Sequence, residues 1–289
     1  MMEHFDQVLS YIEKQLKGEI NSQKIARISG CTFASFQKMF SYIVGIPLSE
    51  YIRRRKMSRA VFDLLEGKKI LTVSKEYGYH SPTAFNRAFQ SIHGFPPSEV
   101  VHRKEELTIY PRLRLSLSVS GGEQFQYRLE EKPTLFFVGK KYPLSSDIER
   151  NFHEVPFIWQ NFMGSELEQQ LVEYRKQNQS PIFGIAVAEK AQPAHYYIGV
   201  FKQLEADCPD GLEELVLPAQ RWLLLKGQGS MPEAVQQLYR RFYQEWLPVS
   251  AYEYELKTDV EVYPSQQEMH SSQSCELWLP IRRKELSNE

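Results

Sequence analysis

Apolar residues in the first third of the chain recur every three to four positions, the spacing of a helix with one buried face. The first such set is Phe5, Val8, Leu9, Ile12 and Leu16. Capping residues, glycines and prolines divide the remainder into further helices. The predicted helices are 5–16, 22–29, 32–43, 49–66, 71–77, 81–94 and 97–102. The pattern therefore predicts an all-α region.

The segment Ser81–Gly94 has a twin earlier in this region. Ser81 suits an N-cap, Pro82 the first turn and Gly94 the end of a helix. With an offset of 49 positions, Phe36, Phe40, Gly45, Pro47, Ser49 and Glu50 match Phe85, Phe89, Gly94, Pro96, Ser98 and Glu99. Each copy follows a short amphipathic segment that ends in glycine, so we predict two helix-turn-helix units. The helix 49–66, capped by Ser49 and ~27 Å long, would space them for neighbouring segments of one DNA groove.

The exposed faces of the two second helices are candidates for contact with DNA. Polar side chains there can bind base edges and phosphates. The candidates from the pattern are Ala34, Gln37, Lys38 and Ser41 in the first copy and Thr83, Asn86, Arg87 and Gln90 in the second. A basic run on the spacer helix is either a solvated face or a set of phosphate contacts. This run consists of Arg53, Arg54, Arg55 and Lys56, with Arg59.

Residues 1–105 resemble the DNA-binding domain of the AraC/XylS family of bacterial transcription regulators, nearest its MarA, SoxS and Rob branch. The resemblance is carried by Ile25-Ala26, Ser29-Gly30, Phe36 to Phe40, Gly45, Tyr51 to Arg53, Arg55 to Met57, Ala60, Leu64-Leu65, Ile70, Val73, Tyr77 to Tyr79, Ser81, Phe85, Arg87 to Phe89, Gly94 and Pro97-Ser98. It implies base contacts by Ala34, Gln37, Lys38, Pro82, Thr83, Asn86 and Arg87. Ala34 and Pro82 replace a large aromatic residue and a glutamine of the family, so the preferred DNA sequence does not carry over.

The remainder of the chain alternates between strand and helix patterns. The predicted strands are 107–119, 124–129, 135–139, 182–188, 195–201, 220–226, 259–263 and 275–281. Helices are predicted at 155–177 and 232–246. This order indicates a two-part α+β domain with pseudo-twofold symmetry. We expect a linker or strand at 106–122 and the domain itself at 123–289.

Two predicted strands place carboxylates beside large aromatic residues. Because side chains alternate along a strand, Glu261 and Tyr263 share one face, and so do Glu276 and Trp278. If helices cover the aliphatic faces, a carboxylate among aromatic rings on the opposite face suits an organic cation. The alternative is an outer face washed by solvent.

This region resembles the GyrI-like small-molecule-binding domains, which are built from two strand–helix–strand–strand modules. The resemblance is carried by Tyr196 to Val200, Leu217 to Ala219, Gly227, Glu245 to Pro248, Ser250, Tyr252-Glu253, Glu261 to Tyr263 and Glu276 to Ile281. It implies a central groove, often with a buried glutamate for lipophilic cations. Glu261 is the first candidate for that glutamate and Glu276 the second. The candidate groove walls are Trp159, Tyr197, Trp222, Tyr263 and Trp278.

Composition and charge limit which binding partners and which cellular compartment we expect for this protein. Residues 1–110 have a net charge of +5 and the remainder a net charge of −6, which favours a polyanionic partner for the front half. No apolar run is long enough to span a bilayer, and the first residues lack the pattern of a secretory signal. The three cysteines fit neither a disulfide framework nor a paired zinc site. We expect a cytoplasmic bacterial protein without a metal or cofactor and without a membrane partner.

The two halves together predict a sequence-specific, DNA-binding transcription regulator whose rear groove senses a small, lipophilic or cationic effector. The expected partners are double-stranded DNA, the effector and, as a further candidate, RNA polymerase. Two alternatives remain for the rear domain. In the first, the rear domain is a GyrI-like hydrolase in which a groove glutamate acts as general base. In the second, it binds only another protein. Since no nucleophile–base pair stands out, we expect no enzyme.

Overall fold

The computed structural model describes residues 2–114, 126–145, 147–175, 180–188, 194–203, 207–255, 258–263 and 274–284. The chain divides into two compact units, Met1–Gly121 and Gly122–Glu289, called here the helical unit and the sheet unit. Within the described ranges, no helix is long and apolar enough to cross a membrane.

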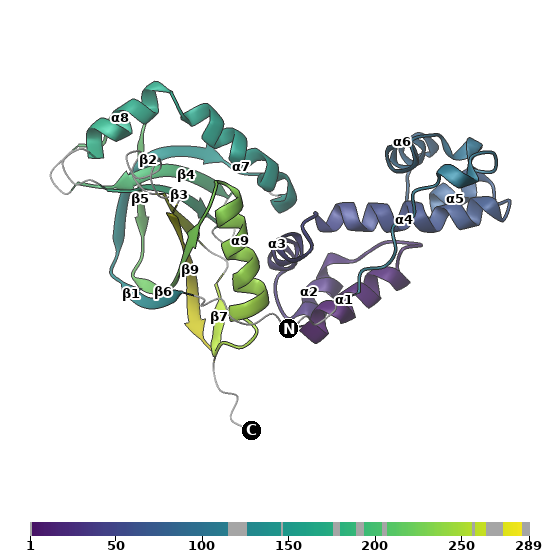
Figure 1. The fold of residues 1–289 in the computed structure, drawn as a ribbon, viewed down its shortest axis with the longest axis horizontal. Coiled ribbons are helices and arrows are strands. Elements are labelled where there is room, and N and C mark those ends of the chain that lie inside the picture. Colours follow the sequence, from purple (N-terminus) through teal and green to yellow (C-terminus); the bar gives the residue numbers. More distant parts are fainter. Residues whose placement is uncertain are drawn as a thin grey trace. The chain divides into compact units, whose positions relative to one another are not determined.

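The helical unit contains two helix-turn-helix pairs joined by one long helix (Figure 1). Its helices are α1 (Met2–Lys14), α2 (Ser22–Ser29), α3 (Phe33–Val44), α4 (Leu48–Leu65), α5 (Ile70–Glu76) and α6 (Pro82–His93), followed by 3₁₀ turns at Pro97–Glu99 and Lys104–Glu106. α2 and α3 form the first pair, and α5 and α6 form the second. Figure 1 shows α3 and α6 near opposite ends of α4.

The two predicted recognition helices, α3 and α6, begin and end alike. The side-chain oxygens of Thr32 and Ser81 each accept the backbone N–H three residues later, at 3.1 Å. Gly45 and Gly94 follow the helices with φ of +79° and +81°, a left-handed conformation that side chains disfavour. The repeat in the sequence is thus a repeat of cap chemistry.

Each recognition helix is anchored by its pair of phenylalanines. Phe36 and Phe40 pack with Phe5 of α1, at ring-centroid distances of 5.5 and 5.7 Å. Phe85 and Phe89 lie 5.9 Å apart in the second pair. All five rings are 2% exposed or less, so each pair has its own aromatic core.

Two predictions about the helix and strand boundaries of the helical unit are wrong. Ser49 does not cap α4, which begins one residue earlier at Leu48 after Pro47. The segment predicted as a strand at 107–119 forms none over its described part, 107–114, and the rest lies outside the described residues. Instead, the Tyr110 backbone N–H donates to Ser58 Oγ of α4 at 2.9 Å. The Tyr110 N–H is thus satisfied by a side chain of α4, and not by the backbone carbonyl of a neighbouring strand.

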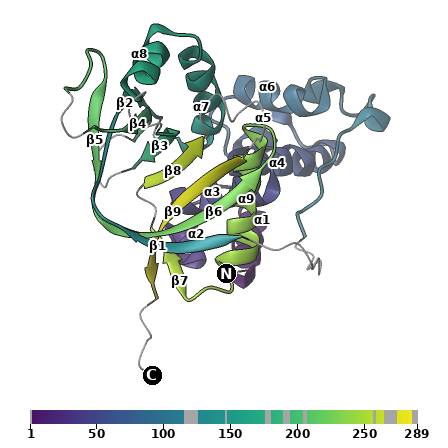
Figure 2. The same cartoon turned by 60° about the vertical axis from the view of Figure 1, so that its left-hand side comes forward.

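The sheet unit is one curved antiparallel sheet with helices on one side (Figures 1 and 2). Its elements are β1 (Tyr127–Lys132), β2 (Leu135–Pro143), α7 (Ile148–Phe162), α8 (Glu166–Arg175), β3 (Ile182–Val187), β4 (His195–Phe201), β5 (Glu213–Leu217), β6 (Gln220–Gln228), α9 (Glu233–Arg241), a π-helical turn (Phe242–Trp246), β7 (Tyr252–Tyr254), β8 (Thr258–Tyr263) and β9 (Ser274–Arg283). The strand order is β1-β6-β9-β8-β3-β4-β2-β5, with β7 paired to β9.

This order confirms the predicted pair of strand–helix–strand–strand modules. The first module is β2, α7 with α8, β3 and β4, and the second is β6, α9, β8 and β9. From the centre of the sheet outward, each module contributes its second, third and first strand in that order. At the centre, β3 of one module pairs with β8 of the other. The two modules therefore meet along the β3–β8 ladder.

Other details of the sheet unit differ from the prediction. The single helix predicted at 155–177 is two helices over its described part, because Gly164 adopts a φ of +79° after α7 ends. The strands β5 and β7 were not predicted, since they are only five and three residues long. Short edge strands carry too few residues for a clear alternation.

The two faces of the sheet carry different cores. On the helix side, α7 and α8 cover a cluster of Val138, Phe162, Leu171, Ile182, Tyr196, Ile198, Val200 and Leu212. On the opposite side lies a second cluster, called here the aromatic cluster, of Phe137, Phe183, Ile185, Tyr197, Leu217, Trp222, Leu224, Val260, Val262 and Trp278. Since Val260 and Val262 belong to the aromatic cluster, Glu261 and Tyr263 face the helices.

Candidate functional site

Glu261 occupies the centre of the sheet unit. In the ladders of β8 it pairs with Gly184 of β3 and with Leu277 of β9, so it lies where the two modules join. Its side chain is half-buried on the helix side of the sheet. The strand parity predicted that Glu261 and Tyr263 share a face. The prediction also assumed that helices cover the aliphatic face of each strand. This assumption is wrong for β8, because the helices lie on the side of its carboxylate.

A chain of hydrogen bonds holds the Glu261 carboxylate among aromatic rings. Tyr196 Oη donates to Glu261 Oε2 at 2.7 Å, and Tyr263 Oη donates to the same oxygen at 2.8 Å. Trp159 Nε1 of α7 in turn donates to Tyr196 Oη at 2.9 Å. The rings of Trp159 and Tyr263 meet edge to face at 4.7 Å. These four residues are called the Glu261 cluster below.

The two hydroxyls of the Glu261 cluster stay protonated. Burial raises the pKa of Tyr196 and of Tyr263 well above the ordinary value, and the neighbouring Glu261 charge raises both further. Both phenols therefore remain hydrogen-bond donors at any physiological pH. The nearby Cys275 thiol also stays protonated, because burial raises its pKa to about 11.

The other predicted groove residues lie on the opposite face of the sheet. Tyr197, Trp222 and Trp278 belong to the aromatic cluster, where they are at most 7% exposed. Glu276 lies on the same side, because its pairing with Val262 gives it the parity of that residue. The seven predicted residues therefore divide between the two faces, with Trp159, Glu261 and Tyr263 on the helix side and the other four on the opposite side.

Glu276 has a different environment from Glu261. Its carboxylate accepts a hydrogen bond from Trp278 Nε1 at 3.1 Å. It also lies 3.4 Å from Arg128 Nη2 and 3.6 Å from Lys226 Nζ. Two cations of the protein thus compensate its charge, so it is a weaker candidate for binding a cationic ligand.

Sequence reasoning missed Tyr196, the buried donor of the Glu261 cluster. The sequence offers two adjacent tyrosines, Tyr196 and Tyr197, and alternation places only one of them on the helix side. Glu261 and Tyr196 are 65 positions apart. The register of β3 between β4 and β8 decides which tyrosine reaches Glu261, and this register is not visible in a single strand.

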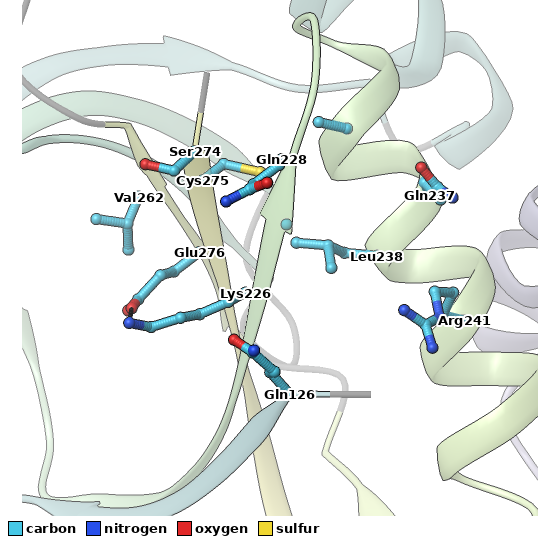
Figure 3. A pocket seen from close by; sticks show the side chains of 12 residues that line it. Gln126, Lys226, Gln228, Gln237, Leu238, Arg241, Val262, Ser274, Cys275 and Glu276 are labelled. Atoms are coloured by element: carbon cyan, nitrogen blue, oxygen red, sulfur yellow. Dashed lines mark ion pairs between the residues drawn. The ribbon is translucent and has the colours of Figure 1, made fainter. Parts of the chain in front are cut away.

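A pocket of about 620 Å³ lies beside the Glu261 cluster, between α9 and the ends of β6 and β9 (Figure 3). It is lined by Gln126, Lys226, Gly227, Gln228, Ala234, Gln237, Leu238, Arg241, Val262, Ser274, Cys275 and Glu276. Figure 3 shows Lys226 and Glu276 meeting on one side and Gln237, Leu238 and Arg241 of α9 on the other. The lining is mostly polar, so it suits the polar end of a ligand more than its apolar body.

The second recognition helix presents its predicted residues to solvent. Pro82, Thr83 and Arg87 are exposed on α6, and Asn86 is half-buried. Ser81 caps this helix and Gly94 ends it, so these side chains stand on a fixed backbone. The exposed side chains of α6 are therefore held in a fixed arrangement at the surface of this helix.

The first recognition helix is less open. Ala34, Gln37 and Lys38 of α3 are half-buried. The prediction that Ser41 belongs to an exposed face is wrong, because its hydroxyl oxygen is buried, without a hydrogen-bond partner in the described part of the chain. Ser41 stands in the third turn of α3.

The basic run on α4 divides into two kinds of side chain. Arg53 and Arg54 both pair with Glu50, and the Arg54 guanidinium also lies 4.7 Å from the Tyr110 ring. Arg55 is buried and pairs with Glu13 at 2.7 Å. Lys56 donates to the Tyr77 carbonyl at 2.8 Å, and burial lowers its pKa. Neither interpretation offered for the run fits Arg55 and Lys56, which hold the helical unit together.

The described ranges contain no group of three or more His, Cys, Asp or Glu side chains that could hold a metal ion.

Two families match the two units. Residues 128–281 match the family described as "Integron-associated effector binding protein", and residues 25–103 match a helix-turn-helix domain. The HTH-type transcriptional activator AarP of Providencia stuartii is 33% identical over 93 residues, which are 32% of this chain and 69% of AarP. The putative HTH-type transcriptional regulator YkgA of Escherichia coli K12 is 34% identical over 34% of this chain, which spans only 41% of YkgA. The solved structure of SAV2435 bound to tetraphenylphosphonium covers 54% of this chain and 94% of its own, with 21% identity and a TM-score of 0.47.

Proposed function

Because the chain belongs to the family of integron-associated effector-binding proteins and also carries a helix-turn-helix domain, we propose that it is a DNA-binding transcription regulator. In this proposal the sheet unit senses a lipophilic organic cation, and the helical unit binds DNA in the cytoplasm. The Glu261 cluster supports the choice of ligand most directly. It combines a half-buried carboxylate with three aromatic side chains at the junction of the two modules.

The chemistry of the Glu261 cluster favours a cation over a neutral ligand. A carboxylate away from water is costly unless an opposite charge or hydrogen bonds stabilise it. The phenols of Tyr196 and Tyr263 supply hydrogen bonds but no charge. A ligand cation supplies the charge, and the Trp159 and Tyr263 rings attract it through their π faces. An apolar body would displace water from the same rings.

Titration with tetraphenylphosphonium tests the ligand site. The wild-type chain should bind this cation but not tetraphenylborate, which has nearly the same shape and the opposite charge. Glu261→Gln should weaken cation binding at least tenfold, a loss of about 1.4 kcal/mol. Glu253→Gln is the matched control, since it removes a carboxylate of β7 that pairs with Arg282 and should leave the affinity unchanged. Equal affinity of wild type and Glu261→Gln would reject Glu261 as the cation site.

In the helical unit, α6 is the helix we expect to specify the DNA sequence. Thr83, Asn86 and Arg87 supply the donors and acceptors that base edges require. Ala34, Gln37 and Lys38 of α3 and Arg53 and Arg54 of α4 would add contacts to bases and phosphates. An unbiased selection of bound DNA fragments identifies the site. Fragments without a shared sequence would contradict specific recognition.

A sensor also requires that the ligand change what the helical unit does. We propose that occupancy of the Glu261 cluster changes DNA affinity or contact with RNA polymerase. Such coupling needs a ligand that favours one state of the protein over another. DNA affinity and solution scattering, each measured with and without tetraphenylphosphonium, test this step. Unchanged values in both measurements would leave a DNA-binding protein without a sensor.

A further inference from the structure

Tyr196 reaches Glu261 by crossing the position of a missing side chain. Gly184 of β3 lies between Ile198 of β4 and Glu261 of β8 in the sheet. A Cβ atom at Gly184 would lie 2.1 Å from Tyr196 Oη and 3.0 Å from Glu261 Oε2. No side chain fits at that distance, so only glycine leaves room for the phenol. Gly184 thus makes the bond between Tyr196 and Glu261 possible.

The phenols occupy the acceptor capacity of one carboxylate oxygen. Glu261 Oε2 accepts from both Tyr196 and Tyr263, at 2.7 and 2.8 Å. An oxygen of this kind has about two lone-pair sites. The hydrogen bond from Trp159 Nε1 fixes the Tyr196 hydroxyl from its other side. A ligand that needs Oε2 as an acceptor must therefore displace a buried phenol.

We propose that Tyr196, lying over Gly184, makes Glu261 selective for cations that carry no N–H donors, such as quaternary ammonium and phosphonium ions. The inference rests on the proposed function, because it concerns the cation bound at Glu261. A primary ammonium ion has three N–H donors that need acceptors once water is removed. The other oxygen, Oε1, offers about two lone pairs to these three donors, so the third donor gains Oε2 only by leaving a tyrosine hydroxyl, 2% exposed in the case of Tyr196, without its acceptor. A quaternary ion needs no acceptor and interacts with the carboxylate through charge alone.

Two probes with the same aromatic body test this selectivity. Naphthylmethyl-trimethylammonium has no N–H donor, and naphthylmethylammonium has three; both are cations near neutral pH. Calorimetric titration of the full chain should show tighter binding of the quaternary probe. Tyr196→Phe keeps the ring and removes the hydroxyl, which frees a lone pair of Oε2. The ratio of the two affinities should then fall by about tenfold, the worth of one hydrogen bond to a charged group.

Gly184→Ala changes the same contact from the other side. Its methyl group would push the Tyr196 hydroxyl away from Oε2, so the affinity ratio should fall in the same direction. Tyr239→Phe is the matched control, because Tyr239 Oη donates to a different carboxylate, Asp259, at 2.9 Å. It should leave the ratio at the wild-type value. If Gly184→Ala does not fold, Tyr196→Phe and its control decide alone.

The outcomes separate the inference from the function on which it rests. If wild type binds neither probe, the proposed cation site is rejected and the inference with it. If wild type binds both probes and Tyr196→Phe keeps the wild-type ratio, the cation site stands and the inference is overturned. A ratio that falls in Tyr196→Phe and stays constant in Tyr239→Phe supports it.

Discussion

Asp63 of the helical unit and Glu261 of the sheet unit are carboxylates held in place by different kinds of donor. Asp63 accepts hydrogen bonds from Lys17 Nζ at 2.8 Å, from Tyr77 Oη at 2.7 Å and from Lys68. Glu261 accepts from the neutral hydroxyls of two tyrosines. The lysines neutralise Asp63 within the fold, whereas the phenols orient Glu261 without adding charge.

In the proposed function, this difference separates a structural carboxylate, Asp63, from a ligand-binding one, Glu261. A carboxylate paired with cations of the protein stabilises the fold. Its removal destabilises the fold, because the cations and hydroxyls are left without a partner. A carboxylate held by phenols keeps its charge for a ligand. The cations of the helical unit follow the same division, because Arg55 is buried against Glu13 while Arg87 is exposed on α6.

The largest effect is expected from removing the structural carboxylate. Asp63→Ala should destabilise the helical unit by about 3 kcal/mol, the low end for a broken buried pair because both lysines are partly exposed. Chemical denaturation followed by helix ellipticity measures this loss. All four tryptophans lie in the sheet unit, so their fluorescence follows the other unit in the same experiment.

The counterpart is Glu261→Gln, which should change the stability of the sheet unit by less than about 1 kcal/mol. A glutamine carbonyl can still accept from both tyrosines. If Glu261→Gln costs the sheet unit as much as Asp63→Ala costs the helical unit, Glu261 is structural and the comparison fails.

The next effect concerns the exposed cation. Arg87→Ala should weaken binding to the selected DNA site by roughly 1–3 kcal/mol and reduce discrimination at one base. Arg53→Ala, which removes another partly exposed arginine from the same unit, should weaken binding to all sequences alike. Fluorescence anisotropy with specific and unrelated duplexes measures both. Unchanged affinity for the specific duplex in Arg87→Ala would exclude a base contact by this residue.

A smaller effect follows from the protonation of Asp63. Hydrogen bonds from Lys17, Lys68 and Tyr77 lower the pKa of Asp63 from 3.8 to about 2, against the opposing effect of burial. A lowered folded-state pKa means that the contribution is complete above about pH 4 and is lost as the pH falls toward 2. Wild type should lose roughly 1–2 kcal/mol across this window, and Asp63→Asn should lose less. Denaturant midpoints at a series of pH values test the difference.

The comparison also shows which features a sequence can predict. The helix caps at Thr32 and Ser81 and the two-module fold were predicted correctly, because they depend on nearby residues or on the order of elements. The expected families for the two halves are confirmed by the matches over residues 25–103 and 128–281. Local chemistry and family resemblance thus gave the architecture.

The grouping of the site residues was beyond local inference. Parity correctly separated Glu261 from Val260, but which face the helices cover depends on the whole sheet. For that reason Glu276 and Trp278 were placed with Glu261, although they lie on the opposite face. Whether Arg55 is solvated or buried likewise depends on Glu13, which is 42 positions away.

The smallest effect is expected at a buried base of the helical unit. His93 of α6 is 5% exposed, and its ring lies 4.2 Å from that of Phe89. Burial lowers its pKa below 6.5, so the folded state favours the neutral ring. The stability of the helical unit should be complete above about pH 6.5 and decline as the pH falls through the folded-state value. His93→Phe, which keeps an aromatic ring beside Phe89, should abolish the decline in denaturant midpoints measured by ellipticity. If the decline persists in His93→Phe, another group of the helical unit is responsible.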